Sequence, residues 1–259
     1  MSLSSKAATA VWFLRRPAFW RHGAELVRRK LIRNMDGPEW QLEARRWAEE
    51  REAPVQAALE AVGLLKQGKS LPDLSPALLA EAERLAKLAT APMGGAGDLA
   101  LIHAAARLSY TQRAIETGVA YGWSSLAILA ALAENGNGRL VSVDMPYPKM
   151  NNEAFVGIVV PDALRANWTL VRLPDRNGLK RAIAEFGGSI DFAHYDSDKS
   201  YYGRGFAYPL IWQALVPGGV FISDDIQDNM RFAEFVGEKG VPFAVTECAG
   251  RYVGICRKA

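Results

Sequence analysis

Short apolar runs alternate with amphipathic stretches along the chain from residue 112 onward. Apolar residues predict buried strands at 113–116, 139–143, 168–173, 190–195 and 220–223. Residues spaced as on one helical face predict helices at 124–132, 179–186, 208–215 and 230–238. Because strands and helices alternate, the pattern predicts an α/β fold with a mostly parallel sheet. Two further runs, 243–248 and 252–257, flank Ala249-Gly250 and predict a closing antiparallel hairpin.

The first part of the chain is helical in pattern but is broken by prolines. Pro17 interrupts the first helical stretch, and Pro54 divides a second one that runs over 39–65. After a linker at 68–73, Ser75 and Pro76 predict the N-cap and first turn of a helix that ends near residue 90. We therefore predict an N-terminal helical arm over 1–74 and an α/β domain over 75–259.

Two segments of the predicted domain are irregular. Residues 91–97 are rich in glycine and precede a helix predicted over 98–108. Residues 145–167 contain three prolines and predict an insert near the site, with one short helix at 161–167.

Glycines punctuate the turn between the strand that ends at Glu116 and the following helix. The turn reads Glu116-Thr-Gly118-Val-Ala120-Tyr-Gly122-Trp-Ser124. A strand, a glycine turn and a helix start aim backbone N–H groups at a ligand. A dinucleotide-binding fingerprint would carry glycine at position 120, and the alanine there argues against a pyrophosphate.

This E-x-G-x-x-x-G-x-S stretch resembles motif I of the class I S-adenosylmethionine-dependent methyltransferases. It is most similar to the small-molecule O-methyltransferases of the catechol O-methyltransferase type and to related bacterial methyltransferases. The resemblance implies a Rossmann-like, seven-stranded, mostly parallel sheet with a C-terminal antiparallel hairpin. It also implies that S-adenosylmethionine binds at the turn, and that the segment at 91–97 is part of a lid over it. The cofactor-binding residues implied at the turn are Glu116, Gly118, Ala120, Gly122 and Ser124.

Carboxylates follow several of the predicted strands, where ligands bind in open α/β sheets. The resemblance implies that Asp144 accepts both ribose hydroxyls of the cofactor. The alternative is an acid that caps the following turn. Contacts to the adenine are expected from the loops after the third and fourth strands, which contain Asp175, Arg176, Asn177, Asp196 and Ser197.

Asp196, Asp224 and Asp225 form a second group of acids. In the catechol O-methyltransferase type, acids at these positions hold one divalent cation, and oxygen ligands favour Mg²⁺. Neighbouring carboxylates also repel each other unless a cation or a proton intervenes. The alternative is that Asp224 and Asp225 cap the next helix and that Asp196 contacts the cofactor.

Lys199 lies where the catechol type has its catalytic lysine. A cation nearby would lower the pKa of this lysine and let it take a proton from a substrate hydroxyl. The related bacterial methyltransferases read roughly D-S/G-x-H-S-Y-E here, whereas this chain has Lys199-Ser-Tyr201-Tyr202, which leaves the substrate open. The alternative is an exposed loop lysine, and His194 is predicted to be a core or cofactor-loop residue.

The resemblance therefore implies methyl transfer to a small-molecule hydroxyl, assisted by a divalent cation. Three alternatives remain: a metal-independent methyltransferase on another acceptor, an NAD-type oxidoreductase, or a non-catalytic S-adenosylmethionine-binding protein. The 259 residues, 49% of them hydrophobic, suffice for a full α/β core. With no secretory signal evident, Cys248 and Cys256 are expected to be reduced thiols in a cytoplasmic protein, and their spacing allows them to be cross-strand neighbours.

Basic charge is concentrated at the N-terminus. Residues 1–34 hold eight Lys and Arg side chains against Glu25 alone, interleaved with aromatic residues, while the whole chain carries +3. The favoured interpretation is an arm whose aromatic side packs on the main domain or on a second subunit. Contact with an anionic membrane is the alternative, and nucleic acid is not expected as a partner.

Overall fold

The computed structural model describes residues 3–146 and 152–259, and a seven-stranded sheet forms its centre. The strands are β1 Arg113–Thr117, β2 Arg139–Val143, β3 Trp168–Val171, β4 Ile190–Tyr195, β5 Leu215–Ser223, β6 Phe243–Cys248 and β7 Arg251–Arg257. Their order in the sheet is β3-β2-β1-β4-β5-β7-β6. The first five strands pair in parallel, and β7 pairs antiparallel with both β5 and β6. The predicted mostly parallel sheet with a closing hairpin is confirmed.

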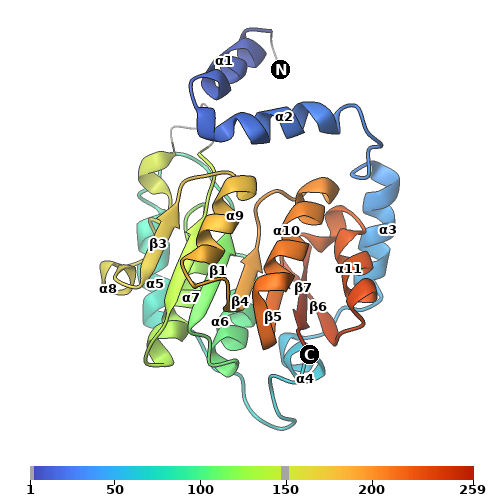
Figure 1. Cartoon of the computed structure of the whole chain (residues 1–259). Helices are drawn as coiled ribbons and strands as arrows, with labels where there is room; N and C mark the ends of the chain where they lie inside the picture. Colours follow the sequence, from blue (N-terminus) through green and yellow to red (C-terminus); the bar gives the residue numbers. More distant parts are fainter. Residues whose placement is uncertain (1–2, 147–151) are drawn as a thin grey trace.

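Helices cover both faces of this sheet (Figure 1). The helices of the domain are α5 Pro76–Ala86, α6 Leu99–Leu108, α7 Trp123–Glu134, α8 Asp162–Arg165, α9 Asp175–Ala184, α10 Tyr201–Ala214 and α11 Arg231–Lys239. One hydrophobic core lies between the sheet and α5, α6 and α7, and it includes Leu101, Leu126 and Phe192. The other lies beneath α9, α10 and α11 and includes Ile115, Tyr208 and Phe235.

Several element boundaries differ from the prediction, and the starts of α10 and β5 differ most. Helix α10 begins at Tyr201 instead of residue 208, because the Ser200 side chain caps it by accepting a hydrogen bond from Gly203 N. Strand β5 begins at Leu215 and includes Pro217-Gly-Gly219, which the sequence predicts as a turn. Both segments lack a clear apolar period, so the hydrophobic pattern alone does not reveal them.

Prolines divide the N-terminal helices as predicted. These helices are α1 Leu3–Leu14, the short 3-10 helix Pro17–Phe19, α2 Trp20–Arg29, α3 Pro38–Glu49 and α4 Val55–Ala61. Pro54 immediately precedes α4. Ser75 precedes α5, but its side chain caps none of the backbone N–H groups in the described chain, and α5 ends at Ala86. Ala48 on α3 and Leu59 on α4 are buried in the cores of the domain.

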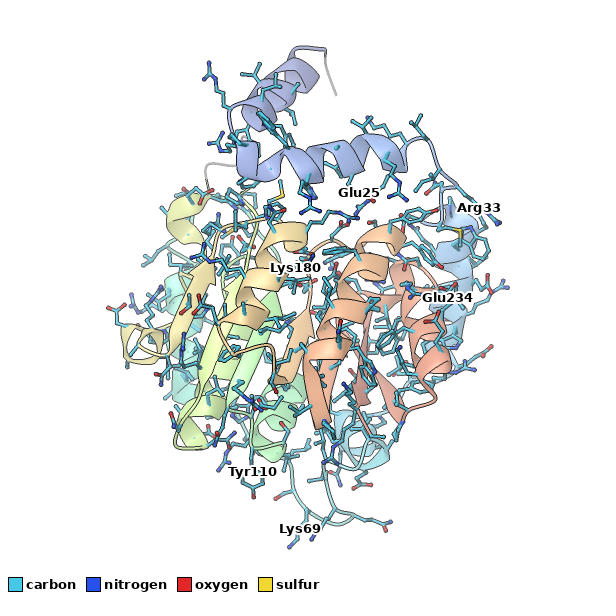
Figure 2. All side chains as sticks on the ribbon, viewed as in Figure 1. Glu25, Arg33, Lys69, Tyr110, Lys180 and Glu234 are labelled. Carbon is cyan, nitrogen blue, oxygen red and sulfur yellow. The ribbon has the colours of Figure 1, made fainter. Side chains whose placement is uncertain are left out.

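Helix α2 lies across the end of the domain (Figures 1 and 2), and Glu25 is on the side that faces it. Glu25 Oε1 lies 2.9 Å from Arg176 Nη2 at the start of α9. Arg29 Nη1 lies 2.8 Å from Asp198 Oδ2, in the loop after β4. The arm therefore packs on the main domain through ion pairs.

The predicted insert at 145–167 contains the 3-10 helix Glu153–Phe155 and α8, and residues 147–151 lie outside the described chain. Val159 and Val160 in this insert are buried against the first core. At the other end of the sheet, β6 and β7 pair Cys248 with Arg251 and Cys256 with Phe243, so the two free cysteines are not cross-strand neighbours. None of the helices within the described residues is long and apolar enough to cross a membrane.

Candidate active site

The ends of β1, β4 and β5 lie side by side and form the floor of the site. The register aligns Thr117 with Tyr195 and Tyr195 with Ser223. The residues that follow these strands, Gly118, Asp196 and Asp224, therefore lie next to one another. The strand order changes direction between β1 and β4, and open α/β sheets bind ligands at such a switch point.

The turn after β1 needs unusual backbone geometry. Gly118 has φ +80°, and a Cβ atom there would lie 2.2 Å from the carbonyl oxygen of Asp196. Ala120 also adopts a left-handed conformation, with φ +48°, at the position where the dinucleotide fingerprint has glycine. The turn thus keeps the shape of a glycine loop, and it delivers Ser124 to the first turn of α7.

A cavity of about 210 Å³ lies between this turn, the strand ends and the segment before α6. Of the predicted cofactor-binding, metal-binding and catalytic residues, seven line it: Gly118, Ala120, Ser124, Asp196, Lys199, Asp224 and Asp225. Gly94, Gly95, Ala96 and Gly97 form another wall, which is where the resemblance places a lid. The walls carry four carboxylates, on Asp98, Asp196, Asp224 and Asp225, against two cationic side chains, Lys199 and Arg251. This excess of carboxylates fits a ligand that carries a sulfonium and an ammonium group, as S-adenosylmethionine does.

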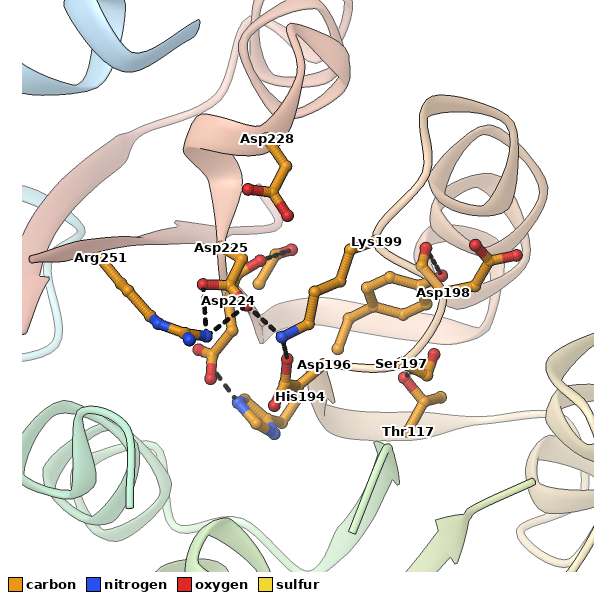
Figure 3. Close-up of polar contacts among 12 residues, drawn as sticks. Thr117, His194, Asp196, Ser197, Asp198, Lys199, Asp224, Asp225, Asp228 and Arg251 are labelled. Atoms are coloured by element: carbon orange, nitrogen blue, oxygen red, sulfur yellow. Dashed lines mark hydrogen bonds and ion pairs between the residues drawn. The ribbon is translucent and has the colours of Figure 1, made fainter. Parts of the chain in front are cut away.

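Lys199 lies among the aspartates of the cavity (Figure 3). Its Nζ lies 3.0 Å from Asp196 Oδ1 and forms a close ion pair with Asp225 Oδ2. Arg251 Nη1 lies 3.1 Å from both carboxylate oxygens of Asp225. Asp225 is therefore held by two cationic side chains.

These contacts determine the protonation of Lys199 and Asp196. Burial alone would lower the pKa of Lys199, but Asp196 and Asp225 outweigh it and raise the pKa above its usual value. Burial and the neighbouring Asp224 carboxylate raise the pKa of Asp196 to about 6, although Lys199 opposes the increase. The sequence-based expectation of a lowered lysine pKa rests on a bound cation. In the contacts described here, Lys199 carries its proton.

The predicted metal ligands come together, but their partners do not suit a metal. Asp225 is paired with Lys199 and Arg251, and Asp224 Oδ1 lies 3.3 Å from His194 Nε2. Within the described part of the chain, no group of three or more His, Cys, Asp or Glu side chains is arranged to hold a metal ion. The donor set as it stands does not fit a divalent cation, because internal cations already contact its oxygens.

Glu116 is buried behind the cavity and does not line it. Its Oε2 accepts hydrogen bonds from Ser125 Oγ at 2.5 Å and from Ser142 Oγ at 2.7 Å. His194 lies between Glu116 and Asp224, 3.7 Å from Glu116 Oε1. Burial alone would lower the pKa of His194, but these two carboxylates raise it to about 10. A buried imidazolium thus links β1 to the end of β5, a position that agrees with the core assignment of His194.

Asp144 follows β2 and is nearly buried. Its Oδ1 accepts a hydrogen bond from Val119 N at 3.0 Å, and its Oδ2 forms a close ion pair with Arg172. Burial raises the pKa of Asp144, and the contacts with Val119 and Arg172 oppose the increase. Each carboxylate oxygen has a second lone pair, so a ribose hydroxyl can still be accepted.

The loops expected near the adenine lie side by side. Ser197 Oγ donates a hydrogen bond to Asp175 Oδ2 at 2.5 Å, and it lies 2.9 Å from Thr117 Oγ1. Asn177 lies in the first turn of α9. Gly122 is the residue before α7 and, like Glu116, Asp144, Asn177 and Ser197, does not line the cavity itself. No bound ligand tests these roles, which stay predictions.

Two charged residues of the site are missing from the sequence-based prediction. Arg172 directly follows β3, and because Val143 pairs with Val171, the register alone would have placed it beside Asp144. Arg251 reaches the site from the first residue of β7. The local sequence around the Ala249-Gly250 turn carries no signal for that contact.

Comparison with known proteins supports the class that the sequence resembles. Residues 115–226 match the sequence model of a family described as a methyltransferase domain. Among curated proteins, no sequence matches the chain. The match begins in β1 and ends just after β5, and together with the seven-stranded fold it supports the predicted resemblance to the class I S-adenosylmethionine-dependent methyltransferases.

Several solved structures share the fold at low sequence identity. An O-methyltransferase from Bacillus cereus in complex with SAH is 16% identical, with 82% of this chain and 100% of that chain covered and a TM-score of 0.57. A putative O-methyltransferase from Klebsiella pneumoniae is 15% identical, with coverages of 82% and 100% and a TM-score of 0.54. The O-methyltransferase TomG from Streptomyces achromogenes, in complex with SAM, is 17% identical, with coverages of 82% and 99% and a TM-score of 0.51. At these identities the likeness concerns the fold.

Proposed function

We propose that this protein transfers a methyl group from S-adenosylmethionine to a hydroxyl oxygen of a small molecule. The observation that carries the proposal is the cavity between the Gly118–Ser124 turn and the acids Asp196, Asp224 and Asp225. Its excess of carboxylates suits a cationic cofactor. The similar solved structures are named as O-methyltransferases, which supports oxygen as the acceptor atom.

The residues of the cavity have distinct proposed roles. S-adenosylmethionine, when bound, supplies a methyl group that its sulfonium makes electrophilic. The turn and Ser124 hold the methionine end, and Asp144 holds the ribose. Lys199 contacts the acceptor oxygen and, as an ammonium, offsets the negative charge that grows on it. Asp196, beside Lys199, receives the hydroxyl proton.

The sequence-based expectation of a divalent cation on Asp196, Asp224 and Asp225 is the competing proposal. The ion pairs of Asp225 with Lys199 and Arg251 favour a site whose positive charge comes from the protein itself. Turnover in the presence of a strong chelator separates the two. Full activity in chelator supports the internal cations, and activity that returns only with Mg²⁺ supports the metal.

The proposed reaction is tested by following S-adenosylhomocysteine formation over a panel of phenols, catechols and aliphatic alcohols, with amines and thiols as comparison acceptors. Calorimetry with S-adenosylhomocysteine and NADH is run beside it. We expect binding of S-adenosylhomocysteine alone and turnover with hydroxyl acceptors. Tight NADH binding would favour the oxidoreductase alternative. Cofactor binding with turnover on amines alone would reject the hydroxyl acceptor.

We also propose that the enzyme works in the cytoplasm. Both cysteines, Cys248 and Cys256, are free, as expected for a reducing compartment. Fractionation of cells that express the tagged protein tests this proposal.

A further inference from the structure

Exposed apolar side chains are concentrated on the N-terminal arm. Among the described residues, six of the nine large hydrophobic side chains that are exposed lie between positions 11 and 31. They are Val11, Leu14, Trp20, Leu26, Val27 and Leu31, and Leu31 is 83% exposed. The domain itself leaves few such side chains in water, so the arm is the exception on this surface.

Helix α2 is oriented opposite to an ordinary surface helix. Trp20, Ala24 and Val27 on α2, and Leu31 in the turn that follows it, recur at the spacing of one helical face, and all four are exposed. We call this set the outer face. The opposite face carries Glu25 and Arg29, whose side chains are ion-paired with the body of the domain. The polar face thus provides the ion pairs with the body of the domain. On the outer face, Trp20 Nε1 donates a hydrogen bond to Leu14 O in α1, while Val27 and Leu31 stay exposed.

Positive charge surrounds the outer face. Exposed basic residues of the arm lie on both sides of it and beyond its N-terminal end: Arg15, Arg16, Arg21, Arg28 and Lys30. The single acid of residues 1–34, Glu25, is buried and contacts Arg28, Arg29 and Arg176. The outer face therefore presents apolar groups and uncompensated positive charge together.

A basic recess lies directly beside the outer face. Its volume is about 340 Å³, and it is lined by Arg21, Ala24, Glu25, Arg28, Arg176, Lys180 and Phe206. Four of these side chains are cationic and one is acidic. Arg and Lys side chains in such a recess match the phosphate of a lipid headgroup.

We propose that the outer face of α2 docks on an anionic membrane surface, with Val27 and Leu31 in the interface and the flanking basic residues among the headgroups. Amphipathic helices with one apolar face and basic flanks bind membranes in this way. A second copy of the same face is a poorer occupant, because it would bring the two sets of basic residues together. Charge complementarity thus selects the anionic bilayer.

The docked orientation would bring the methyl-transfer site close to the membrane. Arg29, on the inner face of α2, contacts Asp198 and Ser200 in the loop that also carries Asp196 and Lys199. A helix is about 10–12 Å wide, so this loop would lie about one helix diameter below the surface. This consequence, unlike the docking itself, rests on the proposed function.

The test is co-sedimentation of the full chain with vesicles of phosphatidylcholine alone or mixed with phosphatidylserine, at low and high salt. We expect binding to the mixed vesicles only, and weaker binding at high salt because exposed charges are screened. Val27→Ser with Leu31→Ser should weaken binding by about 10- to 100-fold. The matched control, Leu42→Ser with Leu88→Ser, removes exposed apolar residues elsewhere and should bind as the wild type does.

Charge is tested in the same way. Arg21→Ser with Lys30→Ser should weaken binding by roughly five-fold for each charge removed, whereas Lys66→Ser with Lys69→Ser should not. Circular dichroism verifies that each variant is folded. Equal binding to neutral and mixed vesicles, or unchanged binding of Val27→Ser with Leu31→Ser, would overturn the proposal. A third outcome would also overturn it: the wild type binds no vesicles and forms a dimer in sedimentation velocity, and Val27→Ser with Leu31→Ser abolishes that dimer. A second copy of the chain would then cover the outer face.

Discussion

Arg29 and Asp198 form an ion pair at 2.8 Å that joins the N-terminal arm to the loop carrying Asp196 and Lys199. The same guanidinium donates a hydrogen bond to Ser200 Oγ at 2.8 Å, and Ser200 caps α10. The side chain of Arg29 is only 13% exposed, so water screens the pair weakly. The position of the arm and the conformation of the site loop are therefore linked through one side chain.

Replacing Arg29 with methionine should destabilise the protein. A charged hydrogen bond of this kind contributes about 1.5–3 kcal/mol, so the free energy of unfolding at neutral pH should fall by about that amount. Burial alone would raise the pKa of Asp198, but Arg29 outweighs it and lowers the pKa below its usual value. The stabilisation is thus present above the pKa of an unfolded aspartate and is lost as pH falls through the lower folded value. Denaturant titration measures the free energy of unfolding of Arg29→Met, and the more exposed Arg28→Met is the control. An equal decrease in both variants would contradict the role of the Arg29–Asp198 pair.

Asp175 should produce the opposite pH dependence. Burial, and then the charge of Asp198, raise its pKa to about 6, against hydrogen bonds from Ser197 and Tyr195. The folded state therefore holds the proton more tightly than the unfolded chain, whose aspartates titrate near about 3.9. The contribution of this protonated carboxyl to the free energy of unfolding is therefore complete below about pH 4 and is lost as pH rises through about 6. The difference in unfolding free energy between wild type and Asp175→Asn should shift over that window. For the exposed Asp162→Asn, the difference from wild type should not change with pH. If the difference for Asp175→Asn also did not change with pH, the raised pKa of Asp175 would be contradicted.

The sequence predicted the sheet well because each strand is buried and bounded by turns. Arg139–Val143, Ile190–Tyr195 and Phe243–Cys248 were predicted residue for residue. Their apolar content reflects burial on both faces, which is a local property of the chain. The glycine turn was found for the same reason, since its backbone geometry is set by adjacent residues.

The parts of the site that depend on distant contacts were not predictable in this way. The sequence predicts a metal beside Lys199, but burial lowers the pKa of this lysine while Asp196 and Asp225 raise it, and Asp225 lies at another strand end. Arg251 reaches Asp225 only because β7 inserts between β5 and β6. The outward orientation of the apolar face of α2 likewise depends on the contacts of Glu25 and Arg29 with the body of the domain. Charge partners across a fold leave no periodic signal in the sequence.

Asp144→Ala should weaken S-adenosylhomocysteine binding. The carboxylate is placed by Val119 N and Arg172, so its removal costs its own hydrogen bonds to the ribose and leaves Arg172 without this partner. At about 1.5–3 kcal/mol per charged hydrogen bond, affinity should fall by at least about ten-fold. Calorimetry measures the affinity, Asp162→Ala is the matched control, and circular dichroism verifies the fold. An unchanged dissociation constant would remove the ribose assignment and leave Asp144 as a cap of the turn.

The two small residues of the turn should respond in opposite ways to substitution. Gly118→Ala would place a methyl group 2.2 Å from the carbonyl oxygen of Asp196, so the turn must shift and both stability and cofactor binding should fall. Ala120 already adopts a left-handed conformation with φ +48°, and Ala120→Gly should relieve roughly 1 kcal/mol of backbone strain. Thermal unfolding with and without S-adenosylhomocysteine compares the pair. A destabilising Ala120→Gly would show that the alanine methyl group packs more favourably than the strain costs.

Lys199 provides the sharpest test of where the positive charge in the site comes from. Its ammonium lies between Asp196 and Asp225. Lys199→Met removes this cation, so the oxygens of both carboxylates become more available, together with Asp224, to bind a metal ion. If the lysine takes the place of a metal, the variant should bind Mn²⁺ more tightly than the wild type does, as measured by calorimetry. Its turnover should fall by about 10²–10³-fold, the usual cost of removing one group that stabilises the developing charge, while S-adenosylhomocysteine still binds. Lys66→Met, on an exposed loop, is the control for removing a positive charge. Should the wild type instead bind Mn²⁺ tightly and lose all activity in chelator, the three aspartates hold a cation during turnover, and Lys199 must move aside when it enters.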